Sequence, residues 1–228
     1  MQAQLKKLYR HLLALPLPPQ CINCGVVLAP TTSPGLCPVC YGPRRAFQLS
    51  QVPVLQDWLH QKNLIADYRA AFFYDDVLSG LITRLKFHDA ADLATPLARL
   101  LLAPLHDLST GLARPTLVPV PLHPQRLRER RYNQAALLAK RLHQATGLPW
   151  LPEGLIRTRA TAHQTGQSRT TRLRQLAGAF AAAPSIRGHD VILLDDVLTT
   201  GSTALACARA LKRGGATSIR VLTIAYVA

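Results

Sequence analysis

The sequence of 228 residues contains no apolar run that approaches the roughly 20 residues of a membrane-spanning helix. Aromatic residues make up only 6% of the chain, so side chains on which nucleobases could stack are sparse. Acidic residues are also few, with 12 Asp and Glu against 27 Lys and Arg. No internal repeat or low-complexity tract is present. These absences exclude a helical membrane protein and a repeat protein, and they leave a globular chain with a formal net charge of +15.

Positive charge is carried mainly by arginine, which supplies 21 of the 27 basic residues. Guanidinium groups match phosphate geometry, and a strong positive field raises the local concentration of polyanions. Two groups of arginines are therefore candidate phosphate-binding residues: Arg126, Arg128, Arg130 and Arg131, and then Arg157, Arg159, Arg169, Arg172 and Arg174. For any single arginine, the alternative is a solvated surface position.

The first twenty residues combine Lys6, Lys7 and Arg10 with a short run of leucines. This arrangement resembles the start of a secretory signal, but prolines from Pro16 onward interrupt the run. No small-x-small cleavage pattern precedes the first cysteine. We therefore expect a short amphipathic helix in a cytoplasmic protein.

Four of the five cysteines form two CxxC pairs separated by twelve residues: Cys21, Cys24, Cys37 and Cys40. Each pair can close a tight turn whose backbone N–H groups support the thiolates, and together they offer four sulfurs to one zinc ion. The intervening segment can form a short hairpin but has too few apolar residues to fold alone, so metal binding would stabilise it. Two disulfides or a redox pair are the alternatives, and a cytoplasmic chain disfavours disulfides. The fifth cysteine, Cys207, lies in an alanine-rich helical run and is expected in the core.

Strand-like and helix-like segments alternate after Arg45, which predicts an α/β domain with a parallel sheet and helices on both faces. Strands are expected at Tyr68–Tyr74, Thr116–Pro121, near Leu155, and at Gly178–Ala182, Val191–Asp196 and Ser218–Ala228. Helices are expected at Val77–Lys86, Leu93–Leu105, Asn133–Thr146 and Ser202–Arg213. A basic loop is expected over 122–132. The chain thus divides into an N-terminal helix with the four-cysteine module, 1–48, and the α/β domain, 49–228.

The segment VILLDDVLTTGST, residues 191–203, carries the most specific chemistry of the chain. Its aliphatic start predicts a buried strand, and in a parallel sheet ligands bind beyond the carboxyl ends of strands. Asp195 and Asp196 are expected at such an end, followed by a loop, 197–203, that enters a helix. Backbone N–H groups of that loop can hold one phosphate at the positive end of the helix. The GxxxxGK[ST] pattern of a P-loop is absent.

The two adjacent carboxylates are not suited to contact that phosphate, because like charges repel. They can accept hydrogen bonds from vicinal hydroxyls or hold a water molecule on Mg²⁺. The implied ligand is a sugar with hydroxyls on one face and a phosphate at one end. A turn that only caps the helix is the alternative, but capping needs one Asp or Thr and not the whole series.

Several segments together resemble one family. VILLDDVLTTGST is similar to the motif with which type I phosphoribosyltransferases bind phosphoribosyl pyrophosphate (PRPP). The two cysteine pairs, LITRLKFH, VPVPLHPQRLRERRYNQAALLA and RTRATAHQTGQSRTTRLRQLAGAF precede it in the order typical of the ComF family. The chain is therefore identified as a member of that family, a double zinc-knuckle group with a type I phosphoribosyltransferase-like fold that is tied to competence and DNA uptake.

The resemblance implies roles for particular residues. Asp195 and Asp196 would bind the ribose hydroxyls of PRPP with Mg²⁺, and Thr199, Thr200, Gly201, Ser202 and Thr203 would bind the 5-phosphate. The place of the pyrophosphate loop is taken by Arg126, Arg128, Arg130 and Arg131. The stretch 157–174, which contains Arg157, Arg159, Arg169 and Arg172, matches the mobile hood that closes over such sites.

Three positions depart from the family pattern and concern local loop geometry. Arg131 stands where a glycine is common, and Gln175 stands where an asparagine is common. Tyr41 is inserted between Cys40 and Gly42.

The sequence is compatible with three functions, and the first is that of a phosphoribosyltransferase. In a transferase, an acceptor of unidentified structure attacks the ribose as pyrophosphate leaves, and arginines with Mg²⁺ stabilise the leaving charge. No general base stands out. Lys86, His88, His123 and His163 lie in family-like segments, but each is more typical of a structural or phosphate-binding residue.

The other two functions need no chemistry. One is a PRPP-responsive protein that binds single-stranded DNA through its phosphates, with Phe72, Phe73, Tyr132 and Trp150 as stacking candidates that are each more typical of a core. The other is a zinc-ribbon adaptor for a helicase-like partner, which would leave the two aspartates without a role.

Overall fold

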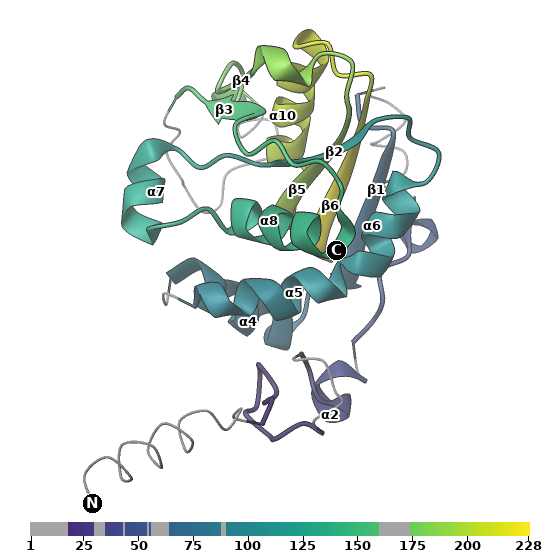
Figure 1. Ribbon diagram of the computed structural model, residues 1–228, viewed down its shortest axis with the longest axis vertical. Helices are drawn as coiled ribbons and strands as arrows, with labels where there is room; N and C mark the ends of the chain where they lie inside the picture. Colours follow the sequence, from purple (N-terminus) through teal and green to yellow (C-terminus); the bar gives the residue numbers. More distant parts are fainter. Residues whose placement is uncertain are drawn as a thin grey trace, which may run out of the picture.

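A computed structural model describes residues 18–29, 35–42, 44–53, 55, 64–87, 90–159 and 174–228. At its centre, four parallel strands lie in the order β1-β6-β5-β2: β1 (Asp67–Phe73), β6 (Ser218–Tyr226), β5 (Asp190–Leu198) and β2 (Pro115–Pro119). Each neighbouring pair is parallel. The aliphatic run Val191–Leu194 is fully buried, as expected of a central strand covered on both faces. The predicted parallel α/β sheet is confirmed (Figure 1).

Helices cover both faces of this sheet (Figure 1). Four of them share one core with the sheet: α4 (Asp76–Phe87), α5 (Ala94–Leu100), α6 (Leu102–Ser109) and α8 (Gln134–Thr146). On the other face packs α10 (Ser202–Arg213), which buries Cys207 as predicted. Ile192 of β5 belongs to the first core and Leu193 to the second, because side chains alternate along a strand.

A second, two-stranded sheet lies against α10. In it, β3 (Leu155–Arg157) pairs antiparallel with β4 (Phe180–Ala182). The two expected strands are thus present, but they form a pair of their own outside the parallel sheet. Most of the expected hood, 160–173, lies outside the described residues.

The expected single helix Leu93–Leu105 is wrong. A 3₁₀ turn, η2 (Ala91–Leu93), leads into α5, and α6 begins after a break at Leu101. The break follows from Pro104, which has no N–H to donate to the carbonyl of Leu100 and so interrupts the helical hydrogen bonds.

The expectation of a basic loop over 122–132 is also wrong, because this stretch contains the helix α7 (Pro124–Arg130). Pro124 occupies the first helical position, where its missing N–H is not needed, and the ring of His123 caps the helix. Arg131 ends the helix in the left-handed region, with φ of 65°. Glycine adopts this region most readily, which explains why a glycine would suit the position.

Residues 44–53 run along the outer edge of β1 and include the 3₁₀ turn η1 (Leu49–Gln51). Ala46 forms an antiparallel bridge with Phe72. The ring of Phe47 is buried against that of Tyr68, with centroids 5.1 Å apart. This stretch therefore contributes to the core of the α/β domain.

The four-cysteine segment packs on the α4 side of the α/β domain (Figure 1). Its helix α2 (Pro38–Tyr41) is capped by Cys37 and contains Cys40, the two members of the second cysteine pair. Ile22 and Leu36 pack against the core to which α4 contributes, and Arg84 of α4 donates a hydrogen bond of 2.7 Å to the carbonyl of Ile22. The module is thus attached to the helix that also carries Lys86.

Two expectations for the N-terminal region lie outside the described residues. They are the amphipathic helix in the first twenty residues and the hairpin between the cysteine pairs, which includes 30–34. Within the described segments, no helix is long and apolar enough to span a membrane.

Candidate functional site

Strand β5 carries both aspartates close to its carboxyl end. The strand continues to Leu198, which pairs with Tyr226, so the expectation that it ends at the two aspartates is wrong by two residues. Asp196 is buried and forms an ion pair of 2.8 Å with Lys86 of α4. Asp195 Oδ1 accepts a hydrogen bond of 2.9 Å from the backbone N–H of Asp196. The two carboxylates therefore have different partners.

The environment of Asp195 disfavours its charge. Burial, and then repulsion by Asp196, raise the pKa of the Asp195 carboxyl to about 7. The backbone hydrogen bond and the positive charges of Lys86 and Arg130 act in the opposite direction but do not offset these effects. Near neutral pH, this carboxyl is therefore poised between its charged and neutral forms.

A cavity of about 570 Å³ surrounds the two aspartates. It collects four basic side chains from three elements that are distant in sequence: Lys86 of α4, Arg126 and Arg130 of α7, and Arg157 of β3. The acidic side chains in its lining are Asp195, Asp196 and Glu129. A site with clustered cations around two carboxylates suits a ligand that carries both phosphates and hydroxyls.

The arginines of the first cluster separate into two pairs. Arg126 and Arg130 lie four residues apart, one turn of α7, and both line the cavity. Arg128 and Arg131 are exposed and do not belong to its lining. Burial, and then the positive charge of the neighbouring Arg126, lower the pKa of Arg130. The cluster thus supplies two cations to the cavity and two to the outer surface.

The second cluster is described only in part. Arg157 lines the cavity, and burial lowers its pKa. Arg159 instead donates hydrogen bonds of 2.9 and 3.0 Å to the carbonyls of Gln175 and Ala177, which tie the two ends of the hood segment together. Arg169, Arg172, His88 and His163 lie outside the described residues.

The expected phosphate loop forms the turn between β5 and α10. Gly201 has φ of 70° and precedes the first residue of the helix, Ser202. The hydroxyl oxygens of Thr200 and Ser202 are 3.0 Å apart. Thr203 belongs to the cavity lining, whereas Thr199 is exposed at the start of the turn. Through Thr203, the N-terminal turn of α10 thus lies beside the cavity.

Lys86 and His123 are the two described members of the group considered for proton transfer. Lys86 is held by Asp196. His123 Nδ1 accepts a hydrogen bond of 3.3 Å from the N–H of Gln125, so this ring caps α7 while it lines the cavity. Both side chains therefore have structural partners.

The four aromatic residues considered for stacking serve mainly in packing. Phe72 and Phe73 are buried, and Trp150 packs against the core of the α8 face. Tyr132 donates a hydrogen bond of 2.8 Å to the carbonyl of Leu85. Sequence reasoning missed Phe87, the last residue of α4, which is 63% exposed. In the sequence, only its position directly after Lys86 distinguishes Phe87 from the other phenylalanines.

The cysteine pairs come together as predicted. The four Sγ atoms of Cys21, Cys24, Cys37 and Cys40 all lie within 4.8 Å of one another, and the pair Cys24–Cys37 is separated by 3.7 Å. Tetrahedral zinc with Zn–S bonds of about 2.3 Å requires S···S separations of about 3.8 Å. Backbone N–H groups of Cys37 and Cys40 point at the sulfurs of Cys21 and Cys37, at 3.3 and 3.4 Å. These residues fit a structural zinc ion.

Fold and site together define a class of protein: a type I phosphoribosyltransferase-like α/β domain joined to a small four-cysteine module. Residues 133–228 match the family model of the phosphoribosyl transferase domain. The chain is 37% identical to the DNA utilization protein YhgH of Escherichia coli (strain K12) over 198 residues, which cover 85% of both chains. It is 36% identical over 158 residues to Competence protein F of Haemophilus influenzae, covering 67% of this chain and 69% of the relative. The chain belongs to the ComF family.

Among solved structures, glutamine PRPP amidotransferase from Bacillus subtilis, complexed with ADP and GMP, matches with a TM-score of 0.41 and 19% identity. The match covers 62% of this chain and 30% of the amidotransferase chain. A likeness of this extent carries no functional conclusion.

Proposed function

We propose that this protein binds PRPP in the cavity around Asp195 and Asp196. One observation carries the proposal: two adjacent carboxylates, the start of α10 and several cations line one cavity. The carboxylates would accept hydrogen bonds from the ribose hydroxyls. The loop of Thr199, Thr200, Gly201, Ser202 and Thr203 would bind the 5-phosphate, and Arg126, Arg130 and Arg157 would bind the pyrophosphate.

The ion pair between Lys86 and Asp196 has a consequence for this binding. Lys86 neutralises one of the two carboxylates, so the cavity does not present two unpaired negative charges to an anionic ligand. Asp195 and Asp196 would also hold Mg²⁺ through their oxygens, because carboxylates are its usual protein ligands. When bound, Mg²⁺ would supply positive charge that offsets the negative charge of the pyrophosphate.

Phosphoribosyl transfer is the reaction that fits this ligand. The bond between ribose C1 and the pyrophosphate oxygen would break as a bond forms to an acceptor atom, and the acceptor would lose its proton to solvent. Arg126 and Arg130 would hold the leaving pyrophosphate. Neither Lys86 nor His123 is assigned as a base, since each is engaged by a neighbour.

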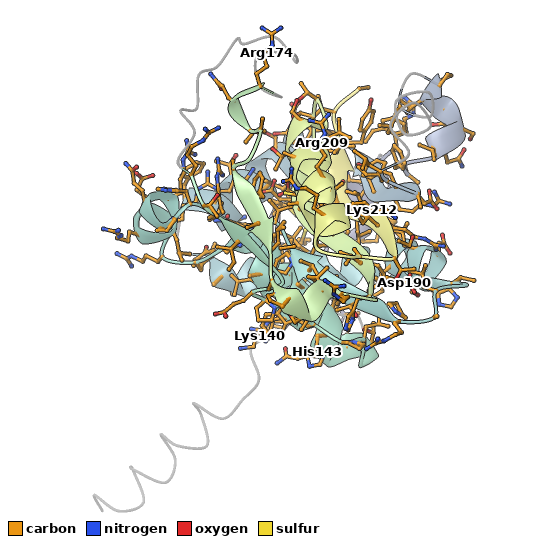
Figure 2. All side chains as sticks on the ribbon, turned by 90° about the horizontal axis from the view of Figure 1, so that it is seen from above. Lys140, His143, Arg174, Asp190, Arg209 and Lys212 are labelled. Atoms are coloured by element: carbon orange, nitrogen blue, oxygen red, sulfur yellow. The ribbon has the colours of Figure 1, made fainter. Side chains whose placement is uncertain are left out.

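A role in DNA use is the second part of the proposal. It is favoured by the names of the relatives YhgH and Competence protein F, and by the spread of positive charge beyond the cavity. Figure 2 shows Lys140 near the lower edge of the coloured ribbon and Arg174 at its top, with Arg209 and Lys212 on α10 between them. Single-stranded DNA is the proposed partner, with Arg128, Arg131, Arg159, Arg169 and Arg172 as candidates for its phosphates. A helicase-like protein partner is the alternative.

Two further assignments remain proposals. We propose one structural zinc ion on the four cysteines. We also propose two units, 1–48 and 49–228, although the packing of Phe47 against Tyr68 suggests that the α/β domain begins a few residues earlier.

Calorimetric titration with PRPP and Mg²⁺ tests the principal proposal. Binding is expected for the native chain, and the double variant Asp195→Asn/Asp196→Asn should lose affinity by about 100-fold. Asp107→Asn, which removes an exposed carboxylate from α6, is the matched control and should bind normally. Absence of binding to the native chain would refute the proposal. A pyrophosphate-release assay over bases and amines, with and without single-stranded DNA, then separates catalysis from binding alone.

A further inference from the structure

The aromatic ring of Phe87 is exposed to solvent, so its apolar surface contributes little burial free energy to the fold. It is 63% exposed, more than any other aromatic side chain in the described part of the chain. Burial of a phenylalanine side chain contributes about 1.5–3 kcal/mol, so this ring leaves apolar binding free energy unused. Single exposed apolar side chains are common on protein surfaces, so the neighbours of Phe87 decide whether its ring has a binding role.

Phe87 lies at the rim of the cavity described above. The residue before it, Lys86, lines the cavity and pairs with Asp196. The guanidinium carbon of Arg130, another lining residue, lies over the Phe87 ring at 4.9 Å from its centroid. Arg130 is also held by Gln134, whose Oε1 accepts a hydrogen bond of 3.2 Å. The last residues of α4 and α7 thus form a fixed pair of an aromatic ring and a planar cation.

The surroundings of this pair favour a particular ligand. Phe87 itself does not belong to the cavity lining, so a small molecule enclosed in the cavity would not cover its ring. Arg128 and Arg131, at the same end of α7 as Arg130, are exposed cations. Aromatic rings next to solvent-exposed cations are the usual platform for single-stranded nucleic acid, where bases stack and phosphates pair with arginine.

We propose that Phe87 and Arg130 form a stacking platform for an unpaired base of single-stranded DNA at the rim of the cavity. The inference rests on the DNA-binding part of the proposed function and does not depend on catalysis. The strand would bring one base to the mouth of the cavity while Arg128 and Arg131 contact its phosphates. The base would stack on the face of the Phe87 ring opposite Arg130, whose guanidinium lies over the other face and holds the ring in place.

Fluorescence anisotropy with two oligonucleotides of equal length tests the platform directly. One is an ordinary single strand, and the other has abasic sites in place of its central bases, so both carry the same phosphate charge. Phe87→Ala should weaken binding of the ordinary strand by about tenfold and leave binding of the abasic strand unchanged. Phe87→Trp should restore the affinity. Val39→Ala, at another exposed apolar residue outside the cavity, should change neither affinity.

The outcomes separate this inference from the proposed function. Equal effects of Phe87→Ala on both strands, or no effect on either, would overturn the platform. A Phe87-dependent affinity for free nucleobases but not for the strand would also overturn it, because the base would then come from a small molecule. Calorimetry with PRPP should give the same affinity for Phe87→Ala and the native chain, so a failure of PRPP binding is detected separately.

Discussion

Replacement of Asp195 by asparagine should make the protein more stable while it removes PRPP binding. The pKa of this carboxyl is raised from its ordinary value of 3.8 to about 7, chiefly by burial and then by repulsion from Asp196. A carboxyl whose pKa is raised on folding favours the folded state only while it is protonated. The native chain therefore loses stability as the pH rises from about 4 to about 7, whereas the asparagine side chain of the variant does not ionise.

The size of the effect follows from the shift in pKa. A shift of about 3 units, at about 1.36 kcal/mol per unit, sets an upper limit of about 4 kcal/mol on the gain at pH 8. Asp195 is only partly shielded from solvent, so we expect roughly 2 kcal/mol. For a chain of this length, that corresponds to an increase in Tm of about 4–8 °C.

Thermal unfolding between pH 6 and pH 8.5 measures this difference. The gain in Tm of Asp195→Asn over the native chain should increase as the pH rises toward 7.5 and then level off. Asp190→Asn on the same strand is the control: Asp190 accepts hydrogen bonds from the N–H groups of Ala113 and Arg114, so its replacement should destabilise by about 1 kcal/mol. An Asp195→Asn variant that is no more stable than the native chain at pH 8 would refute the reasoning.

Three further predictions concern the rest of the chain. Arg131→Gly should raise the free energy of unfolding by about 1 kcal/mol, because glycine adopts φ of 65° without the cost of a Cβ; chemical denaturation measures this, and an unchanged or lower value would contradict it. Elemental analysis should find one zinc per native chain and none after Cys24→Ser, whereas Cys207→Ser should retain the metal; a zinc-free native chain would contradict the site. Arg84→Ala removes the hydrogen bond to the carbonyl of Ile22 and should increase hydrogen exchange in the four-cysteine module without unfolding the α/β domain, and exchange that stays unchanged would show that this bond does not hold the module.

Local patterns predicted much of the fold because they depend on neighbours in sequence. The aliphatic start of β5 and the alanine-rich α10 are buried as expected. For α8, Asn133 Oδ1 accepts the N–H of Ala135 at 3.0 Å, and Gly147 ends the helix with φ of 75°. Such caps depend on only three or four consecutive residues, so apolar periodicity and capping residues together predict both ends of the helix.

The errors have local physical causes of their own. Pro104 removes one hydrogen bond and divides a helix that the apolar pattern alone presents as continuous. The charge of the basic stretch before Arg131 is typical of a loop, yet Pro124 and a run of good helix formers start a helix there. Charge pattern is therefore a weaker guide to backbone conformation than the residues at helix ends.

The contacts that build the cavity could not be predicted from sequence. Lys86 forms an ion pair with Asp196, which lies 110 residues further along the sequence. Phe87 packs against Arg130, which lies 43 residues further along. No local pattern records such pairs, because they depend on how α4 and α7 pack around the end of β5. The resemblance to a family indicates the arginines as a group, but only the structure separates those in the cavity from those on the outer surface.

The two ends of β5 carry carboxylates with opposite effects on stability: ionised Asp190 stabilises the fold, whereas ionised Asp195 destabilises it. Asp190 accepts two backbone hydrogen bonds, from Ala113 and Arg114, and so joins the start of the strand to the segment that leads into β2. Asp195 accepts only a hydrogen bond from its neighbour's N–H within the described contacts, and burial next to Asp196 opposes its ionisation. Because ionised Asp195 opposes folding although it is half-buried, we interpret it as a ligand-binding residue of the cavity, which four cations also line. This contrast on a single strand supports a binding role for Asp195 more strongly than its place in a motif does.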